Sequence, residues 1–496
     1  MENNDRHIVA IDLGSSKISV TVAKVNGEDV QVIYYKETPA AGIRYSSIYN
    51  DLQARRALEK AVHDAEVELD INITQAVVGM PKFPIRQESG NATIQDRGED
   101  TEITEEDIVD LKRFAQSLYP IEDGSKEAIY GSVAQSFSDG ENFQIIEEDI
   151  IGMGSDTLEG NFKIFIGKKG NLNKIDSLMN KTGVVPMRKY FTAESTARAV
   201  LRDSEMESGV ALIDFGGGCT SVSIYQGKIM RHFASIPFGG KNITNDIKTE
   251  CQISERLAEN IKLAYGACMP EKLQSLSEKV IHIISNNAEP DKQVTVKYLS
   301  EIITARVEEI MMAMLYEIEQ SGFADLLRSG IVVTGGCAQI ANLGNFIYEL
   351  SGYRVRTGYP QGRISAIGCD GIKDTTAAAS IGLILAAKED VLNCEIIEEE
   401  VEEEHTEEPA PAAKTVAEAP AKEVAPEETE APVAPRSQPR DGEIFADDEI
   451  EKIDPPKKKT VKKSRIKIFW DNIKKVQEET GNLLDGFSKE INNEEV

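Results

Sequence analysis

The chain has 496 residues, enough for several domains with hydrophobic cores of their own. Its formal net charge of −29 argues against a nucleic-acid-binding protein, because such proteins cluster Lys and Arg to displace counterions from phosphates. The six cysteines are scattered and form no C-x-x-C pair, which argues against a disulfide framework or a zinc site and favours a reducing compartment.

Residues 1–390 alternate strand-like and helix-like apolar patterns with frequent Gly punctuation, which predicts an α/β protein. The polar segment 1–7 runs directly into an apolar strand pattern, so we expect no signal peptide. No stretch reaches the roughly 20 apolar residues of a membrane span. These features predict a cytosolic body without a spanning segment.

An internal repeat is the most informative feature of this body. Its two copies are Ile11-Asp12-Leu13-Gly14 with Ser19-Val20, and Ile213-Asp214-Phe215-Gly216 with Ser221-Val222. Each copy follows an apolar run and then reaches a glycine turn, at Gly27 and at Gly227. Two strand–turn–strand units at matched positions predict two like domains that face one another.

The first turn of the repeat carries groups that suit a phosphate. Gly14 allows close approach of the backbone, and Ser15 and Ser16 offer hydroxyl and amide donors. Lys17 supplies a point charge for phosphate oxygens. This turn is therefore a candidate phosphate loop.

The second turn, Asp214 to Thr220, offers a second grip on phosphates. Its glycines are Gly216, Gly217 and Gly218. They leave backbone N–H groups bare for phosphate oxygens. Asp12 and Asp214 are then candidates to hold a hydrated Mg²⁺ through water, because Mg²⁺ prefers few carboxylates and several waters.

A third element suits the nucleoside. Residues 331–334 form an apolar strand pattern that ends in Gly335 and Gly336, and a glycine pair there lets adenine or ribose lie flat against the backbone. Each of the three loops alone reads equally well as a plain turn between neighbouring elements. All three in order along the chain predict a nucleotide site, with Mg²⁺ as a further ligand.

The segment 84–168 changes character. Strand-like runs at 128–134 and 161–166 surround one helix pattern at 105–118. Thr104 is a candidate N-cap for this helix, and the first turn is acidic. The residues alone predict a small α+β insertion.

These motifs resemble the two phosphate loops and the adenosine motif of the actin, Hsp70 and sugar-kinase superfamily, and within it most closely the bacterial FtsA family of cell-division proteins. Further segments that resemble this family are Ile151-Gly152-Met153 after an acidic run, Pro237-Phe238-Gly239-Gly240, Ile243-Thr244-Asn245-Asp246, Ala258-Glu259 with Lys262, and Tyr265-Gly266. The resemblance covers about residues 7–390 and the tail helix described below. It implies an actin-like two-domain ATPase fold whose insertion mediates protein contacts.

The resemblance also implies roles for residues of the second domain. Gly239 and Gly240 are expected at the nucleotide, and Glu259 and Lys262 near its ribose or base. Without the resemblance, Glu259 and Lys262 read as a solvated helix face, which is the commoner meaning of such pairs.

Hydrolysis is where the sequence departs from the superfamily, which often places Glu or Gln shortly before the second phosphate loop to orient the attacking water. Aligning on residues 199–201 puts Thr192 at that position, with Glu194 two residues further on. Cys219 stands where Thr or Ser is commoner. With only these weak catalytic candidates, we expect ATP to be bound well and hydrolysed slowly, if at all, by a scaffold rather than an enzyme.

Residues 391–456 read as a disordered acidic linker. Residues 398–408 are nearly all acidic, and Ala, Pro, Glu and Val follow without periodicity. Such a segment cannot bury enough apolar surface to offset the entropy lost on ordering.

The tail 457–496 begins with seven Lys or Arg and no acid between Lys457 and Lys467. Its predicted membrane-binding helix contains Ile466, Lys467, Phe469, Trp470, Ile473, Lys474 and Val476. The apolar members fall on one helical stripe that would enter the headgroup boundary, while the bases attract an anionic leaflet. The alternative, docking on the chain's own core or on a partner helix, is less usual after a long linker.

The sequence thus predicts domain I in two parts (1–83 and 169–205), the insertion (84–168), domain II (206–390), the linker and the tail. The resemblance implies an ATP-binding scaffold that self-associates into filaments and tethers the tubulin-like FtsZ to the inner face of the cytoplasmic membrane at the septum. Other division proteins are its expected further partners, and nucleic acid is not.

Three other classes share this core. A small-molecule kinase needs a catalytic Asp beside an acceptor pocket, and no such signature lies outside the phosphate loops. An Hsp70-type chaperone would carry a folded β-rich domain after residue 390, where this chain turns acidic. A pilus-assembly relative of FtsA shares core and insertion, and the basic amphipathic tail argues against it.

Overall fold

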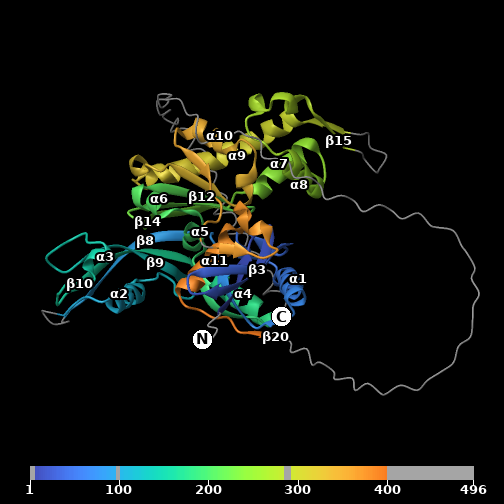
Figure 1. Cartoon of the computed structure of the whole chain (residues 1–496). Coiled ribbons are helices and arrows are strands. Elements are labelled where there is room, and N and C mark those ends of the chain that lie inside the picture. The colour runs from blue at the N-terminus through green and yellow to red at the C-terminus, as the bar shows by residue number, and fades with distance from the viewer. Residues whose placement is uncertain (1–5, 96–100, 284–291, 363, 399–496) are drawn as a thin grey trace, which may run out of the picture. The chain divides into compact units, whose positions relative to one another are not determined.

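The computed structural model of the chain describes residues 6–95, 101–283, 292–362 and 364–398 (Figure 1). The predicted linker from 399 onwards and the predicted tail helix lie outside these residues. Within the described residues, no helix is both long and apolar enough to cross a membrane.

The first domain is built on a six-stranded sheet of order β11-β7-β1-β2-β3-β19. Its strands are β1 (Arg6–Leu13), β2 (Lys17–Asn26), β3 (Asp29–Pro39), β7 (Gln75–Gly79), β11 (Val185–Tyr190) and β19 (Ile364–Ala366). Strands β1, β2 and β3 form an antiparallel meander, whereas β7, β11 and β19 each join their neighbour in parallel. Its helices are α1 (Asp51–Leu69), α4 (Lys169–Lys181), α5 (Thr192–Val200) and α11 (Ala378–Glu389), and its short strands are β4 (Ile43–Arg44), β5 (Ser47–Ile48), β6 (Ile71–Ile73) and β20 (Ile396–Glu398).

The second domain repeats this plan on a five-stranded sheet of order β14-β13-β12-β17-β18. Its strands are β12 (Val210–Phe215), β13 (Thr220–Gln226), β14 (Ile229–Ile236), β17 (Ile331–Thr334) and β18 (Val355–Thr357), with a separate hairpin of β15 (Val280–Ile283) and β16 (Lys292–Thr295). Its helices are α6 (Asp203–Ser208), α7 (Gly240–Cys251), α8 (Glu255–Tyr265), α9 (Val296–Gln320) and α10 (Leu343–Ser351). Its short 3₁₀ turns are η1 (Pro270–Lys272), η2 (Gln274–Glu278), η3 (Ala324–Leu326) and η4 (Gly336–Gln339), whereas η5 (Asp370–Lys373) and η6 (Thr375–Ala377) lie in the first domain between β19 and α11.

The predicted repeat is confirmed in the registers of the two hairpins. Asp12 lies opposite Ser19 in the pair of β1 and β2, and Asp214 lies opposite Ser221 in the pair of β12 and β13. Gly27 and Gly227 both adopt left-handed backbone angles, with φ of +56° and +58°, where a side chain would be strained. Each aspartate therefore stands one residue before the end of the first strand of its hairpin.

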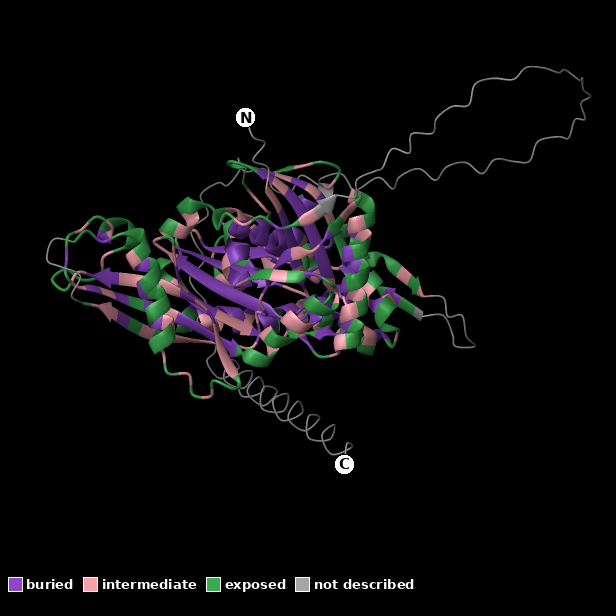
Figure 2. Ribbon diagram, turned by 90° about the horizontal axis from the view of Figure 1, so that it is seen from below, coloured by how far each residue is buried: buried purple, intermediate pink, exposed green. Residues whose placement is uncertain are grey.

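The insertion is a separate layer on an antiparallel sheet of order β8-β10-β9. Its elements are β8 (Ile85–Ile94), α2 (Glu105–Leu118), β9 (Glu127–Ser138), α3 (Glu147–Ile150) and β10 (Leu158–Lys168). The predicted helix 105–118 is confirmed, and Thr104 and Asp107 form a reciprocal capping box at its start. Leu111 of α2 packs on Phe162 and Ile164 of β10, and all three are buried. Figure 2 shows the buried residues, in purple, along the strands at the centre of the ribbon.

The C-terminal boundary of domain II at residue 390 is wrong. Strand β19 pairs with β3, and α11 lies in the first domain, where Figure 1 shows it in orange among blue strands. Ile381 and Ile384 of α11 are fully buried in one cluster with Ile8 and Ala10 of β1. Helix α11 is apolar on nearly every side, so it must be buried on all of its faces. It is buried in the first domain, between β1 and α5.

The predicted start of the linker at residue 391 is also wrong. The Cys394 N–H donates to the His7 carbonyl at 2.7 Å, and the Thr74 hydroxyl donates to the Glu395 carbonyl at 2.7 Å. Strand β20 pairs with β6 beyond them. The acidic composition that follows hid this strand, because only two isoleucines mark it in the sequence.

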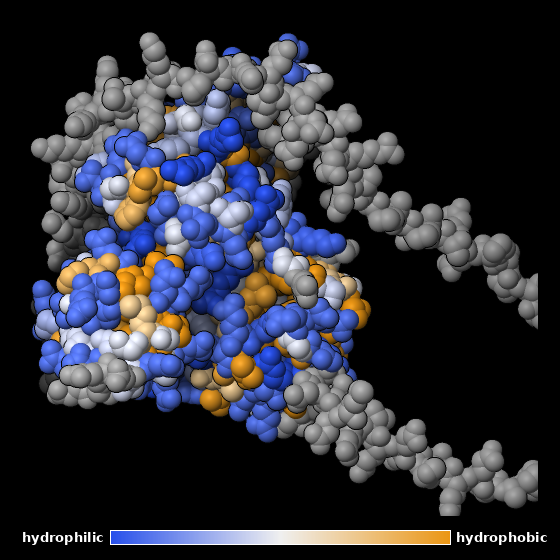
Figure 3. Space-filling model, turned by 60° about the vertical axis from the view of Figure 1, so that its left-hand side comes forward, coloured by the Kyte–Doolittle hydropathy of each residue, from blue (hydrophilic) through white to orange (hydrophobic). Residues whose placement is uncertain are grey.

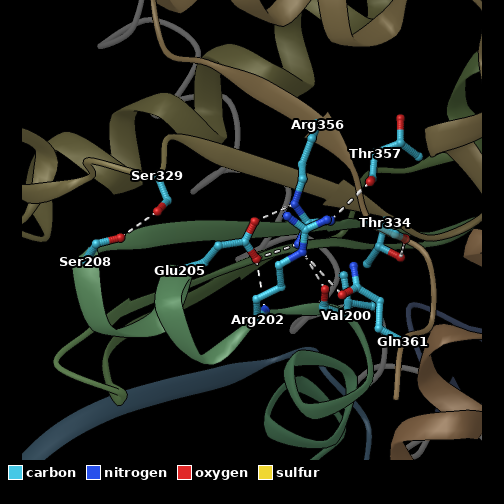
Figure 4. Close-up of polar contacts among 10 residues, drawn as sticks. Val200, Arg202, Glu205, Ser208, Ser329, Thr334, Arg356, Thr357 and Gln361 are labelled. Atoms are coloured by element: carbon cyan, nitrogen blue, oxygen red, sulfur yellow. Dashed lines mark hydrogen bonds and ion pairs between the residues drawn. The ribbon is translucent and has the colours of Figure 1, made fainter. Parts of the chain in front are cut away.

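Two chain segments cross between the domains, one from α5 to α6 and one from β18 to β19. Arg356 of β18 joins them: its guanidinium donates to both carboxylate oxygens of Glu205 at 2.6 Å and to the Val200 carbonyl at 3.0 Å (Figure 4). The Gln361 N–H donates to the Ala199 carbonyl at 2.7 Å. The crossings are thus tied to one another by side-chain and backbone bonds.

On the face drawn in Figure 3, the orange apolar areas are separated by blue hydrophilic residues. This mixed surface is ordinary for a folded protein, because polar atoms alone cannot cover it.

Candidate functional site

A cavity of about 430 Å³ lies between the two domains, at the turns of the two hairpins. The predicted site residues that line it are Asp12, Gly14, Ser15, Ser16, Lys17, Thr192, Asp214, Gly216, Gly217, Gly218, Gly240, Glu259, Lys262, Gly335 and Gly336. Its volume falls in the range of small-molecule and cofactor sites. Loops that are far apart in the sequence therefore meet around one space.

The two predicted phosphate loops pack against one another. A Cβ atom on Gly217 would lie 2.0 Å from the Ser16 hydroxyl oxygen, and one on Gly218 would lie 2.5 Å from the Ser15 side chain. The Ser15 hydroxyl accepts a hydrogen bond from the Ser46 N–H at 2.9 Å. Glycine is required at both positions because any side chain would drive the loops apart.

Cations surround the cavity. Lys17 forms an ion pair with Glu37. Burial raises the pKa of Glu37, but the charge of Lys17 and the hydrogen bonds from Lys17 and the Tyr35 hydroxyl hold it below its ordinary value. Lys241 donates to the Ser15 carbonyl. These positive groups make the cavity suitable for an anionic ligand.

On the side of the second domain, Lys262 and Glu259 form an ion pair at 2.8 Å. The Lys262 ammonium also donates to the Thr244 hydroxyl at 2.8 Å and to the Gly240 carbonyl at 3.2 Å. Its side chain is only 9% exposed, so the reading of these two residues as a freely solvated face does not fit Lys262.

The third predicted loop meets Asp214. Gly335 has φ of +88°, and a Cβ atom there would lie 2.7 Å from Asp214 Oδ1 and from the Phe215 carbonyl oxygen. The Thr334 hydroxyl donates to the Gly358 carbonyl at 2.9 Å and fixes the end of β17. At Gly336, by contrast, a Cβ atom would make only an ordinary contact, with the Thr376 side chain at 3.9 Å.

Three predicted residues do not line the cavity. Thr220 is fully buried and donates to the Phe238 carbonyl at 2.8 Å, and Gly239 packs on the Gly216 carbonyl beneath the loop. Glu194 forms an ion pair with Arg198 one helical turn along α5 at 2.8 Å. Thr192 does line the cavity, but it is 1% exposed and its hydroxyl donates to the Met80 carbonyl.

Lys82 is a cavity residue that the sequence reasoning missed. Its ammonium forms an ion pair with Asp214 Oδ2, across the gap between the domains. Burial lowers the pKa of Lys82, but Asp214, Cys219 and Asp12 outweigh burial and raise it above its ordinary value. Its place in the chain could have revealed it. Lys82 follows β7, which runs parallel to β1, so the two strands end at the same edge of the sheet, and Lys82 lies near Asp12.

The arrangement at Asp12 and Asp214 does not fit a magnesium ion held directly between them. Lys82 already pairs with Asp214 Oδ2, and Oδ1 lies close to Gly335, where a Cβ atom would be 2.7 Å from it. Burial raises the pKa of Asp12, against the opposing charges of Lys82 and Lys17. In the described part of the chain, no group of three or more His, Cys, Asp or Glu side chains is placed to hold a metal ion.

The family model described as "Cell division protein FtsA" matches residues 211–382. FtsA of Neisseria meningitidis is 29% identical over 393 residues, which are 78% of this chain and 91% of that protein. FtsA of Borreliella burgdorferi is 29% identical over 379 residues, covering 76% and 90%.

Among solved structures, the PilM-PilN type IV pilus biogenesis complex contains a chain that matches with a TM-score of 0.54 at 11% identity, covering 76% of this chain and 98% of that one. At this identity the match concerns the fold alone. The fold, with a cleft between two like domains, is actin-like. The family model and these relatives thus make the chain similar to FtsA cell-division proteins, in the case of the two relatives over most of its length.

Proposed function

We propose that the chain is an ATP-binding scaffold of cell division. It self-associates, holds FtsZ at the inner face of the cytoplasmic membrane at the septum, and recruits later division proteins. The observation that carries the ATP part is the convergence of both hairpin turns and of the Gly335 loop on one cavity. The partner and membrane parts rest on the FtsA relatives and on the predicted tail helix.

Slow hydrolysis is part of this proposal. The Thr192 hydroxyl donates to the Met80 carbonyl, and the Glu194 carboxylate is paired with Arg198. Neither group is poised to orient a water against a phosphate in this arrangement. ATP would then act as a bound ligand that holds the two domains together, and its hydrolysis would not be needed for each interaction with a partner.

The ATP site is tested by Gly335→Ala. A methyl group there would collide with Asp214 and Phe215 and displace the loop, so ATP affinity measured by calorimetry should fall at least about tenfold, a loss of roughly 1.4 kcal/mol. Gly352→Ala is the matched control, because Gly352 also has a positive φ (+76°) but no atom within 4 Å of the new methyl group. Equal affinities of both variants and the original chain would contradict the proposed site.

The membrane part is tested by flotation with anionic liposomes. The intact chain should float, whereas Trp470→Glu and a chain ended after Asp454 should remain in solution, because both lose apolar burial at the headgroup boundary. Trp470→Phe keeps an aromatic ring and should still float. If all four chains behave alike, the tail serves a protein partner, and a pilus-type role, which the fold also permits, gains ground.

A further inference from the structure

The loop that carries Lys82 lines the cavity and is held in place by hydrogen bonds. The Met80 N–H donates to the Tyr190 carbonyl at 2.8 Å, and the Met80 carbonyl accepts from the Thr192 hydroxyl at 2.7 Å. Lys82 follows two residues later, and its side chain is 14% exposed. The direction of the ammonium is therefore set by a loop anchored to two neighbouring elements of the first domain.

The ammonium stands where the charges of both domains meet. Lys82 comes from the first domain, whereas its partner Asp214 lies one residue before the end of β12 in the second and has a side chain only 11% exposed. Asp12, at the matching place in the first domain, also feels the charge of Lys82. One chain-borne cation thus faces both carboxylates that the repeat brings together.

Other lysines around the cavity do not serve these carboxylates in the same way. Lys17 is paired with Glu37, and Lys262 with Glu259. Lys241 donates to the Ser15 carbonyl at the edge of the first phosphate loop. Lys82, by contrast, is a lysine of the first domain whose ion pair is with the aspartate of the second hairpin.

A polyphosphate entering this space meets two carboxylates of its own sign. Repulsion between unit charges a few ångströms apart is worth several kcal/mol at the polarity of a partly buried site, so a cation is needed there. Mg²⁺ requires near-ideal octahedral oxygen ligands, and Lys82 already pairs with Oδ2 of Asp214, one of the two carboxylates that could supply them. A lysine ammonium binds phosphate as a point charge without such a requirement.

We propose that Lys82 supplies this cation from the chain itself and contacts the bound polyphosphate, so that the cavity binds ATP with little dependence on Mg²⁺. This inference rests on the proposed ATP binding and adds a charge-providing residue to it. Lys82 also neutralises the aspartates before the ligand arrives, which keeps the two hairpin turns close enough to share one phosphate chain.

The experiment measures ATP affinity by calorimetry in Mg²⁺ and again in EDTA, on full-length chains. The original chain should lose less than about threefold on removal of Mg²⁺. Lys82→Met, which keeps the length of the side chain but not its charge, should bind more weakly and lose about tenfold or more in EDTA. Lys82→Arg should restore a small dependence on Mg²⁺.

Lys189→Met is the matched control, because Lys189 lies in the same domain, is 26% exposed and forms an ion pair with Asp176 outside the cavity. It should behave like the original chain, and thermal unfolding of every variant shows that each is folded. If the original chain needs Mg²⁺ as strictly as Lys82→Met does, the inference about Lys82 is wrong while ATP binding stands. If ATP binds to no chain under either condition, the proposed function itself fails.

Discussion

Arg356 ties together the two chain segments that cross between the domains. Its planar guanidinium meets Glu205 through two bonds of 2.6 Å and reaches the Val200 carbonyl from the same plane. Their side chains are 26% and 12% exposed, so the pair is only partly screened by water. Burial raises the pKa of Glu205, but the bonds from Arg356 and from the Arg202 N–H outweigh it, and the net pKa is lowered.

Arg356→Gln should therefore lower the free energy of unfolding by about 2 kcal/mol at pH 7, measured by urea denaturation. Arg356→Lys should recover little, since an ammonium cannot reproduce the two parallel bonds. A carboxyl with a lowered pKa stabilises the fold above its unfolded pKa of about 4.3, and this contribution is lost as the pH falls through the folded pKa. The difference between the original chain and Arg356→Gln should thus be constant from pH 7 to about 5 and shrink below about 4; a difference that grew with acid would contradict this account.

At the scale of elements, the contact between α5 and α11 holds the first domain together. A Cβ atom on Gly382 of α11 would lie 2.0 Å from the Ser195 carbonyl oxygen of α5, which is backbone and cannot move aside. The helices can approach this closely only because residue 382 has no side chain.

Gly382→Ala should lower the free energy of unfolding by about 3 kcal/mol, because overpacking a helix contact forces both backbones to shift. Gly344→Ala is the control: it also places alanine in a helix, but its new methyl group would meet only Val355 at 3.8 Å. That variant should be neutral or stabilised by up to about 1 kcal/mol through helix propensity. Thermal unfolding of both variants compares them directly.

Elements with a local signal were predictable from the sequence. The hairpin turns at Gly14 and Gly216 could be located because the repeat places the same residues at the same spacing, and α2 because Thr104 and the acidic turn mark its start. Lys82 was missed because its partner Asp214 is 132 residues away, and no local pattern marks an ion pair across two domains. The domain to which α11 belongs was missed for the same reason. An all-apolar sequence indicates that a helix is buried, but it does not indicate in which domain.

At the scale of the whole molecule, the first domain is closed by the segment after α11. Cys394 is 2% exposed, its N–H donates to the His7 carbonyl, and β20 extends the contact to β6. A chain ended after Asp390 should therefore unfold more easily than one ended after Glu399, by about 3 kcal/mol for the lost buried side chains and backbone bonds. Equal midpoints of thermal unfolding for these two chains would show that this segment contributes nothing.

The return of α11 and β19 to the first domain has a consequence for synthesis on the ribosome. The second domain is continuous in the sequence between its two crossings, so it has all of its strands once β18 has emerged. The first domain, begun earliest, still lacks β19 at one sheet edge and α11 over β1 at that moment. Domains generally fold as units, from the N-terminus onwards, during translation. In this chain the order is reversed: the half that is made first is completed last, and its apolar sheet face stays open until residue 389 leaves the ribosome.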